Sequence, residues 1–418
     1  MRQLRMGVIG LGQGAAHALP AIEALPEAAL VAGADTNERM RTGFVERFAG
    51  TRAYATAAEL CADPEIDAVW IATPNKYHRD HAVAAMRAGK HVLVEKPMAV
   101  TLAEADDMVE AARANDVHLL AAHTSSYGIP VRVMRRISQD ELGKVRSILI
   151  WSYTDWMLRA RTGDELSLEA GSGIVHRQSP HQIDALRLLG GGLLRSVRGT
   201  TGQWMPERPI PGYYTAYLEF EDGTPSTIVH NGYGYFMHGE LFPGALDHNR
   251  YTDADRIAVR NEMRSGRRDE EREKEAFRIG GSNDPTKNKD DGGMRPWGHP
   301  DVGMILVSCD RGDMRQAKYG VTVHGDRGRR EIDVRGIGRQ DFDLEGGATV
   351  GALLEMYDAV MQGLPLFHSG AWGRATLEAT LAIVQSAQER REIILSRQVA
   401  MPAEYDAALD LSAGLVTA

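Results

Sequence analysis

The 418-residue sequence predicts an α/β protein in which a doubly wound parallel sheet is followed by an α+β domain with a large, mostly antiparallel open sheet. Three observations lead to this fold class. A glycine-rich turn follows the first apolar run, strand and helix patterns alternate as far as residue 122, and longer β-rich runs dominate after residue 123. A chain of this length also exceeds one ordinary domain, so we expect two.

The first domain, residues 1–122, is predicted from its alternation of short apolar runs with helical patterns. The expected strands are 5–9, 29–34, 68–72, 91–94 and 117–121, and the expected helices are 37–48, 56–61, 78–88 and 101–114. Thr101 and Glu104 form a capping box at the start of the last helix. Such alternation indicates parallel strands with helices on both faces of the sheet.

The glycine-rich turn matches the fingerprint of dinucleotide-binding Rossmann folds. Gly10, Gly12 and Ala15 occupy the three small-residue positions, with Gln13 and Gly14 between them. The first glycine allows a tight turn, the second lets the backbone approach a pyrophosphate, and the third small residue lets the helix pack on the strand. The helix N-terminus then presents N–H groups and a partial positive charge to the phosphates. We therefore expect an N-terminal Rossmann domain.

Asp35 ends the second apolar run, roughly 20 residues after the fingerprint, where an acid meets a ribose 2′-hydroxyl. A carboxylate repels a 2′-phosphate, so Asp35 favours NAD as the cofactor. Arg39 and Arg41 lie close enough in sequence to leave NADP open. Pro20 falls inside the first helix, which it is expected to kink or shorten.

The second domain, residues 123–418, is predicted from β-rich runs joined by turns. The expected strands are 145–154, 194–203, 213–221, 225–233, 303–309, 318–324 and 328–334. Helices are expected near 179–190, 349–362 and 371–392, and the first of these ends in three consecutive glycines. These elements indicate an antiparallel sheet with helices packed against it.

An insertion, residues 236–300, differs in composition from its surroundings. Between Arg264 and Glu275 lie five basic and five acidic residues, which predict a solvated helix held by i,i+4 pairs. Gly280 to Gly293 then reads as a long loop. The insertion is interpreted as a surface excursion, as a cover for the active site or as a subunit contact.

Composition and charge exclude several classes of function. The net charge of −9 and the pI near 5.9 argue against a nucleic-acid surface. Cys61 and Cys309 are too few and too far apart for a disulfide framework or a metal site, so no metal is expected. The first residues run straight into a strand without a signal peptide, and no apolar stretch approaches the ~20 residues of a membrane helix. We expect a cytoplasmic protein without membrane or nucleic-acid partners.

Two loops at the carboxyl edge of the predicted parallel sheet carry polar residues. Thr73, Pro74 and Asn75 follow one buried strand, and Glu95 and Lys96 end the next. Ligands bind along this edge in doubly wound folds. A lysine beside a cofactor cation in a partly desolvated cleft exchanges protons near neutrality, so the turn and the lysine together suggest a nicotinamide-dependent oxidoreductase. The alternative is an ordinary surface lysine.

Two segments of the second domain could meet this edge. His123 follows the last predicted strand of the first domain and is expected to cross the interdomain cleft. Pro180 can start a helix, on which His181 and Asp184, three residues apart, share one face. A histidine can take the proton of a substrate hydroxyl as hydride leaves the same carbon. The alternative is a helix-capping or buried polar pair.

Aromatic and basic side chains follow the first strand of the second domain. Paired arginines suit a carboxylate, because a guanidinium binds it with two parallel hydrogen bonds. Surface arginines are also common, which is the alternative. The side chains that we expect in the substrate pocket, those of the preceding segments included, are His123, Tyr153, Asp155, Trp156, Arg159, Arg161, Arg177 and Asp184.

Taken together, these motifs resemble the glucose–fructose oxidoreductase / inositol dehydrogenase (Gfo/Idh/MocA) family. The resemblance rests on the glycine turn, on Thr73-Pro74 with His78 behind it, on Glu95-Lys96-Pro97, and on His181 with Asp184. It implies hydride transfer between a nicotinamide and a hydroxyl-bearing carbon, with Lys96 and His181 acting as a pair. It also implies a subunit interface on one sheet face, so a homodimer or homotetramer is expected. The residues that it assigns to the cofactor site, beside the turn and Asp35, are Thr73, Pro74, Asn75, His78, Glu95 and Lys96.

Within this family the chain is most similar to the phthalate 4,5-cis-dihydrodiol dehydrogenases. The stretches that carry this similarity are 152–155, 180–184, 186–192, 306–311 and 368–373. The resemblance implies oxidation of a non-aromatic cis-diol to a catechol in aromatic-acid catabolism, with Arg159, Arg161 and Arg177 as partners of the phthalate carboxylates.

One departure from the family pattern bears on the mechanism. Many members carry an aspartate four residues before the catalytic histidine, and here that position is Arg177. The proton relay must therefore be arranged differently, and Arg177 can contact an anionic substrate instead. The alternatives are a sugar, inositol or glycoside oxidoreductase, a glycosidase that uses NAD transiently, and a non-catalytic regulator, which the retained Lys96 and His181 disfavour.

Overall fold

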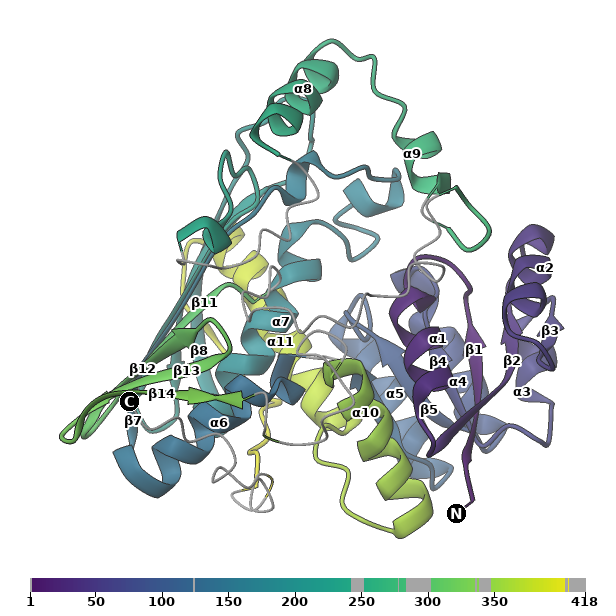
Figure 1. Ribbon diagram of the computed structural model, residues 1–418, viewed down its shortest axis with the longest axis horizontal. Helices are drawn as coiled ribbons and strands as arrows, with labels where there is room; N and C mark the ends of the chain where they lie inside the picture. The colour runs from purple at the N-terminus through teal and green to yellow at the C-terminus, as the bar shows by residue number, and fades with distance from the viewer. Residues whose placement is uncertain are drawn as a thin grey trace.

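Two sheets organise the chain, one in each half (Figure 1). The computed structural model describes residues 2–122, 125–241, 252–276, 278–282, 302–334, 337, 347–402 and 405. A parallel sheet lies in the N-terminal half and a larger mixed sheet in the C-terminal half, with helices between them. The predicted α/β fold class is confirmed.

The N-terminal sheet has six strands in the order β3-β2-β1-β4-β5-β6, and every printed pairing is parallel. Its strands are β1 Leu4–Ile9, β2 Ala28–Ala34, β3 Arg52–Tyr54, β4 Ala68–Ile71, β5 His91–Glu95 and β6 Leu119–Ala122. The three-residue edge strand β3 was not predicted, because it has no apolar run. The order changes direction between β1 and β4, so the loops after these strands meet at the edge where a dinucleotide binds.

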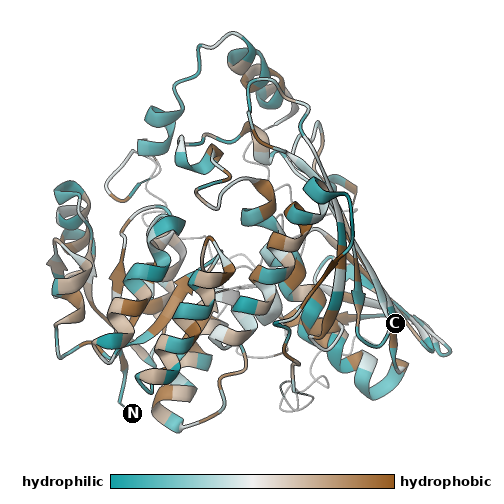
Figure 2. Ribbon diagram, turned by 180° about the vertical axis from the view of Figure 1, so that it is seen from behind, coloured by the Kyte–Doolittle hydropathy of each residue, from teal (hydrophilic) through white to brown (hydrophobic). Residues whose placement is uncertain are grey.

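The helices of this half lie on both faces of the sheet. They are α1 Ala15–Ala24, α2 Glu38–Arg47, α3 Ala57–Cys61, α4 His78–Arg87 and α5 Leu102–Ala114, with the 3₁₀ turn η1 Asn75–Tyr77 before α4. The capping box of Thr101 and Glu104 is present. Helix α1 continues for four residues beyond Pro20, so the proline does not end it. The strands are mostly apolar, and each helix has a hydrophobic and a hydrophilic side (Figure 2).

The C-terminal sheet has nine strands in the order β14-β13-β12-β11-β7-β10-β9-β8-β15. Only β7 and β10 pair in parallel; the other printed pairs are antiparallel. The strands are β7 Val145–Tyr153, β8 Leu194–Gly202, β9 Tyr213–Phe220, β10 Pro225–Asn231, β11 Met304–Cys309, β12 Gly312–Ala317, β13 Gly320–Gly325, β14 Gly328–Asp333 and β15 Ile393–Ile394. Strands β12 and β15 were missed, because neither has a long apolar run.

One helix of this half begins earlier than predicted. Helix α7 spans Ile174–Leu189, so Pro180 lies inside it and does not start it. Gly173, with φ of 89°, sets the start instead, because such a backbone conformation favours glycine. The other long helices are α6 Ile129–Ile137, which the sequence analysis missed, α10 Gly347–Tyr357 and α11 Gly370–Glu389. The short elements include η2 Ser125–Tyr127, η3 Ser138–Leu142, η4 Trp156–Leu158, η5 Asp164–Leu166, η6 His238–Leu241 and η8 Asp358–Gln362.

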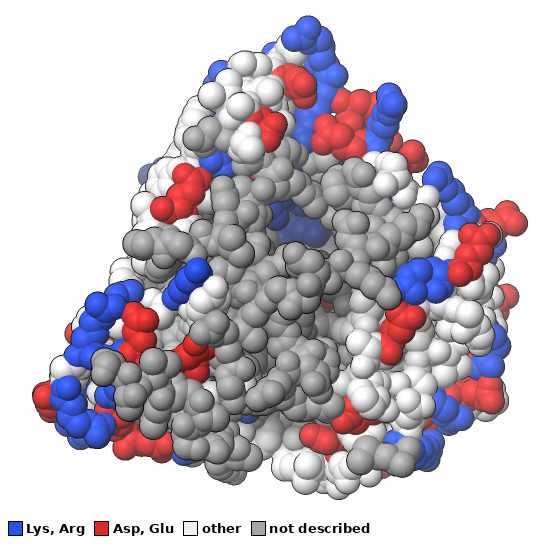
Figure 3. Space-filling view, in the orientation of Figure 1, with Lys and Arg blue, Asp and Glu red and all other residues white. Residues whose placement is uncertain are grey.

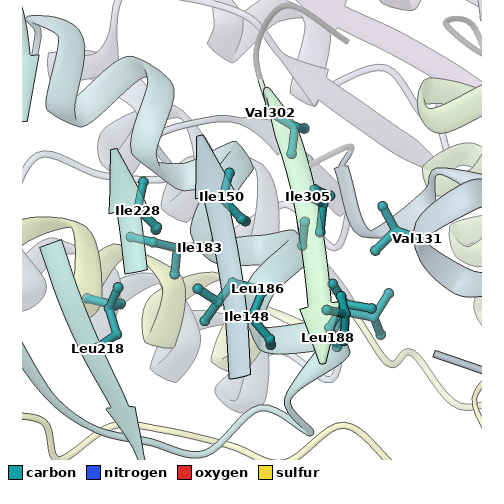
Figure 4. Packing of buried hydrophobic residues seen from close by; sticks show 14 of the residues in the cluster. Val131, Ile148, Ile150, Ile183, Leu186, Leu188, Leu218, Ile228, Val302 and Ile305 are labelled. Atoms are coloured by element: carbon teal, nitrogen blue, oxygen red, sulfur yellow. The ribbon is translucent and has the colours of Figure 1, made fainter. Parts of the chain in front are cut away.

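The core of the second half lies between the mixed sheet and helices α6, α7 and α11. Strand residues such as Ile148, Ile150 and Ile305 face Ile183 and Leu186 of α7 (Figure 4). The opposite face of the sheet has no helix over it in the described part of the chain. The apolar contacts on the helix-covered face therefore determine where α7 lies relative to the sheet.

Helix α10 belongs by packing to the N-terminal half, although it comes late in the chain. Leu353 and Met356 are buried in one cluster with Leu19 and Ile22 of α1. An isolated bridge also pairs Leu120 of β6 with Ser369. The two halves are therefore joined by a shared apolar core, which no local pattern in the sequence indicates.

The described part of the insertion differs from the single solvated helix that was predicted. It contains η6 and two helices, α8 Asp253–Arg264 and α9 Glu270–Ala276. Arg268 lies before α9 and is buried, donating to Glu273 and to the carbonyl of Leu158. Arg268 thus binds the rest of the protein, which the charge pattern of a solvated helix does not indicate. No helix in the described residues has the length and apolarity needed to cross a bilayer.

Candidate active site

The glycine-rich turn between β1 and α1 lies tightly against the end of β4. Gly10 has φ of 89°, and a Cβ atom there would lie 2.9 Å from the carbonyl carbon of Ala72. Gly12, in contrast, has no atom within 4 Å of a would-be Cβ. Gly10 is thus required by the fold, and Gly12 leaves open space above the turn. These two properties fit a backbone that a pyrophosphate approaches closely.

Asp35 holds the turn as well as offering an acid to a ribose. Its Oδ2 accepts the N–H of Leu11 at 2.9 Å, and its Oδ1 accepts the N–H of Asn37 at 2.8 Å. A carboxylate has about four acceptor positions, so two remain for ribose hydroxyls. The guanidinium of Arg41 donates to the carbonyls of Asp35 and Thr36. These residues fit NAD.

His78 connects the two cofactor loops from beneath. Its Nδ1 lies 2.9 Å from the carbonyl of Pro97 and its Nε2 lies 2.8 Å from the carbonyl of Thr73. Burial lowers the pKa of His78 to about 4, so the ring is neutral and donates to one carbonyl at a time. The side chain is 1% exposed. His78 therefore positions Thr73 and Pro97, which differs from the direct cofactor contact that was expected.

Two other residues of these loops make contacts that fix the cleft. Asn75 Nδ2 donates at 2.9 Å to the carbonyl of Gly171 in the second half of the chain. Glu95 Oε1 accepts from Trp70 Nε1 at 3.3 Å. Asn75 therefore ties the loop after β4 to the segment that precedes α7.

Lys96 reaches across the cleft to helix α7. Its Nζ donates at 3.1 Å to the backbone carbonyl of Arg177. In a helix this carbonyl is also the acceptor for the N–H of His181, four residues later. Lys96 is therefore placed one helical turn before His181, and the two predicted catalytic residues belong to one site.

His181 and Asp184 share a face of α7 but have different surroundings. His181 Nδ1 lies 3.2 Å from the hydroxyl of Ser125. Asp184 is fully buried, and its two oxygens accept from the N–H of Ser126 at 2.8 Å and from Trp372 Nε1 at 2.7 Å. The expectation that Asp184 binds substrate is wrong on this geometry, because both oxygens are committed to the fold.

The residues after β7 divide between structural and pocket positions. Tyr153 lies on the sheet face opposite α7, because side chains alternate along β7, and it stacks on Phe236. Trp156 is 2% exposed and is part of the core. Asp155 is buried and pairs with Arg159 at 3.2 Å. Tyr153, Asp155 and Trp156 are therefore not pocket residues, and His123 lies outside the described residues.

A cluster of charged side chains lies beside Lys96 and the cofactor turn. Glu165 Oε1 is 2.9 Å from Lys274 Nζ and 3.5 Å from one guanidinium nitrogen each of Arg161 and Arg177. Among the described residues three cations surround this one carboxylate, which leaves two positive charges in excess. Arg161 lies over the ring of Trp156, and its buried Nε has no hydrogen-bond partner within the described part of the chain.

The pKa values of this cluster follow from burial and from mutual charge. Burial alone would raise the pKa of Glu165, but Arg177, Arg161 and Lys274 lower it to about 2. Burial lowers the pKa of Lys274 to about 8 despite its pairing with Glu165. The two pKa shifts have different origins. Three cations stabilise the charged form of Glu165, whereas Lys274 has one acid nearby and two guanidiniums that oppose its charge. Burial and Arg177 also lower the pKa of Arg161.

Helix α9 of the insertion lies between α8 and α2 at the top of Figure 1. Lys274 Nζ also donates at 2.8 Å to Gln13 Oε1 in the glycine turn. Glu270 forms a two-point contact with buried Arg208 and accepts the N–H of Arg161 at 2.6 Å. Beyond α9, Ile279 packs into the N-terminal core beside α2. The described insertion thus contacts both the glycine turn and the charged cluster through Lys274.

Sequence reasoning did not find Glu165 or Lys274. Glu165 is an isolated acid in an irregular segment, and Lys274 looked like one charge among ten in a solvated helix. Figure 3 shows a hollow in the middle of one face, with Lys or Arg atoms at its floor. Among the described residues, no group of three His, Cys, Asp or Glu side chains could hold a metal ion.

Comparison with protein families supports both halves of this description. Residues 4–123 match the model of an "oxidoreductase family, NAD-binding Rossmann fold". Residues 131–236 match the model of the GFO/IDH/MocA C-terminal domain. The two matches together span more than half of the chain.

Individual proteins are similar over almost the whole length. A 1-carboxy-3-chloro-3,4-dihydroxycyclohexa-1,5-diene dehydrogenase from Comamonas testosteroni is 29% identical, over 91% of this chain and 94% of its own. A solved protein from Bordetella bronchiseptica, described as a dehydrogenase, is 32% identical with a TM-score of 0.84, over 94% of this chain and 100% of its own. A levoglucosan dehydrogenase solved with NADH and levoglucosan has a TM-score of 0.70 at 18% identity, which shows a shared fold; the alignment covers 94% of this chain and 99% of that one.

Proposed function

The chain belongs to the GFO/IDH/MocA oxidoreductase family, and we propose that it oxidises a hydroxyl group of a carboxylated cyclic cis-diol, with NAD⁺ as the hydride acceptor. The family membership makes it an NAD(P)-dependent dehydrogenase with a small-molecule substrate. The charged cluster of Arg161, Arg177 and Lys274 carries the proposal for the acidic substrate.

In this proposal the protein removes the proton of the substrate hydroxyl and orients the groups that take part. NAD⁺ supplies the acceptor for hydride when it is bound. Lys96 Nζ reaches across the cleft to the α7 carbonyl one helical turn before His181, so both side chains can face one substrate hydroxyl as it gives up its proton. The carbonyl of Arg177 holds the lysine ammonium in place, so Lys96 is oriented before substrate arrives.

The charged cluster favours an anionic substrate over a neutral sugar. Burying net positive charge is unfavourable unless an anion compensates it. Arg161 is 9% exposed, and its buried Nε lacks a partner in the described residues. Arg177 is 30% exposed at the side chain and so can turn toward a ligand. A substrate carboxylate would supply the missing negative charge.

The relatives support this assignment to different degrees. The Comamonas testosteroni relative is named for a carboxylated cyclic diol and aligns over almost all of both chains. A levoglucosan dehydrogenase from Pseudarthrobacter phenanthrenivorans is 32% identical but aligns over only 50% of this chain. A sugar or inositol hydroxyl is therefore the second candidate, and the excess positive charge argues against it.

The decisive experiment is a substrate panel that follows reduced cofactor by absorbance, with NAD⁺ and NADP⁺ in separate reactions. The panel contains a carboxylated cis-dihydrodiol, the same ring without its carboxylate, levoglucosan and myo-inositol. We expect turnover of the carboxylated diol with NAD⁺. Oxidation of sugars but not of the diol would overturn the proposal. Hydrolysis of a glycoside without accumulation of NADH would instead indicate a glycosidase.

We also propose a homodimer or homotetramer that pairs through the open face of the C-terminal sheet. Leu306, Leu149, Thr227 and Tyr217 lie side by side across four strands on this face. Leu149 is 37% exposed and Tyr217 is 42% exposed. Exposed apolar side chains that lie together on one surface mark interaction sites.

Light scattering tests this interface. The double variant Leu149→Glu/Tyr217→Glu should shift the protein to monomers, while Leu364→Glu, at an exposed leucine outside the sheet, should leave its mass unchanged. An unchanged mass of the double variant would exclude this face. We further propose that the protein works in the cytoplasm, where the dinucleotide pool is available; fractionation of cells that express the natural chain tests this.

A further inference from the structure

The 3₁₀ turn η2 contacts helix α7 at His181. Ser125 Oγ lies 3.2 Å from His181 Nδ1, and the two side chains are 7% and 4% exposed. These residues come from different elements, 56 positions apart. The contact therefore depends on how the segment between the two halves is folded against α7.

No aspartate precedes His181 on its own helix at the position where many family members have one. Arg177 occupies that position, and its guanidinium reaches Glu165. We propose that Ser125 is a positioning residue that fixes the orientation of the His181 ring through this buried hydrogen bond. The inference builds on the catalytic role proposed for His181.

The Ser125 hydroxyl both donates and accepts, so it can pair with His181 Nδ1 in either neutral form of the ring. Nδ1 donates to Ser125 Oγ when it carries the proton, and Nε2 then has the lone pair that accepts a proton from substrate. When His181 becomes positively charged, Nδ1 still donates to the same oxygen. A serine thus serves both states of the ring, although it lacks the charge of an aspartate.

The turn is fixed to the same helix at a second point. The N–H of Ser126 donates to Asp184 Oδ2 at 2.8 Å, three residues after His181. The other oxygen of Asp184 accepts from Trp372 Nε1 of α11 at 2.7 Å. Asp184 therefore holds the turn in register with His181, which explains why a carboxylate is buried there.

A second group of side chains holds the turn from the opposite side. His368 Nδ1 donates to Glu355 Oε2 at 2.7 Å, and Ser126 Oγ lies 2.8 Å from His368 Nε2. Burial alone would raise the pKa of Glu355, but its interactions with His368 keep that pKa below its ordinary value. Glu355 is therefore a carboxylate at neutral pH, and it fixes the His368 ring that receives Ser126.

Aromatic packing completes the support of the turn. The ring of Tyr127 lies over His368 with 4.1 Å between centroids. A Cβ atom on Gly351 of α10 would lie 2.8 Å from the Tyr127 ring, so a glycine is needed there for the ring to fit. Helix α10 belongs to the N-terminal core, so the position of Ser125 depends on both halves of the molecule.

The test compares Ser125→Ala with Ser179→Ala. Ser179 is also buried, and its hydroxyl bonds Thr380 Oγ1 at 3.2 Å, so its loss is a matched deletion of a buried hydrogen bond. The full-length variants are labelled with ¹⁵N-histidine, and His181 is identified by its absence from the spectrum of His181→Asn. We expect the ring ¹⁵N shifts of His181 in Ser179→Ala to match those of the wild type, and those in Ser125→Ala to differ, because Nδ1 loses its hydrogen-bond partner.

Kinetics provide the second readout. Ser125→Ala should lower kcat by about tenfold with KM changed less than about twofold, and Ser125→Cys should not restore the wild-type spectrum, because a thiol is a weak hydrogen-bonding group. Equal spectra of wild type and Ser125→Ala would overturn the inference. The spectra require no substrate, so they decide it even if the proposed cis-diol is not turned over.

Discussion

The ammonium group of Lys274 donates a hydrogen bond of 2.8 Å to Gln13 Oε1, joining the inserted helix α9 to the glycine turn. The same ammonium lies 2.9 Å from Glu165, which faces the two arginines of the proposed substrate site. A single side chain therefore connects the cofactor turn with the substrate cluster. This contact places the insertion beside the candidate active site.

Release of cofactor should depend on Lys274. Lys274→Met removes the bond to Gln13, so we expect NADH to dissociate about fivefold faster, the effect of roughly 1 kcal/mol for a partly exposed charged bond. Stopped-flow fluorescence of bound NADH measures this rate. Arg272→Met is the matched control, because it removes an exposed positive charge from the same helix. Equal release rates in both variants would show that the bond between Lys274 and Gln13 does not slow the release of cofactor.

Lys96→Ala should stop proton transfer while leaving the fold intact. General acid–base groups contribute about 10²- to 10⁴-fold, so we expect kcat to fall by at least about 100-fold. Affinity for NAD⁺, measured by titration calorimetry, should change little. Lys144→Ala removes a lysine that is paired with Asp222 far from the cleft, and it should keep wild-type turnover. Full activity of Lys96→Ala would remove the mechanism.

Arg177→Gln should weaken binding of the substrate carboxylate. The bond from Lys96 goes to the backbone of residue 177, so the substitution leaves it in place. Hydrogen bonds to charged groups contribute about 1.5–3 kcal/mol, so KM for a carboxylated diol should rise about 10- to 100-fold. KM for the corresponding amide should be nearly unchanged. An equal rise for both substrates would show that Arg177 does not read the carboxylate.

Acid should remove a specific part of the stability. The pKa of Glu165 is about 2 in the folded protein and 4.5 as its ordinary value, so its charge stabilises the fold fully above pH 4.5 and loses this effect as the pH falls toward 2. The shift corresponds to about 3 kcal/mol. In urea unfolding, the advantage of wild type over Glu165→Gln should shrink between pH 5 and pH 3. If the difference in unfolding free energy between the two proteins stayed constant over this pH range, the neighbouring cations would not lower the pKa of Glu165.

Local sequence patterns were sufficient for the Rossmann half and for the position of Lys96. Gly10, Gly12 and Asp35 act through the backbone and through short-range geometry, so their spacing along the chain carries the information. The start of α7 was predicted wrongly because proline is common at the first position of a helix. The sequence does not distinguish that case from a proline inside a helix, which is what Pro180 is. Tyr153 was misassigned because strand alternation placed it on the opposite face.

The sequence by itself determined the family fold, the dinucleotide turn and the pairing of a lysine with a histidine, because each depends on residues close together in the chain or on a family motif. Only the tertiary structure decided which side chains surround that pair. Ser125 reaches His181, Lys274 reaches both Gln13 and Glu165, and Asp184 is buried in the fold. These contacts join segments 56 to 261 residues apart, and their geometry depends on packing of both halves, which no local periodicity encodes.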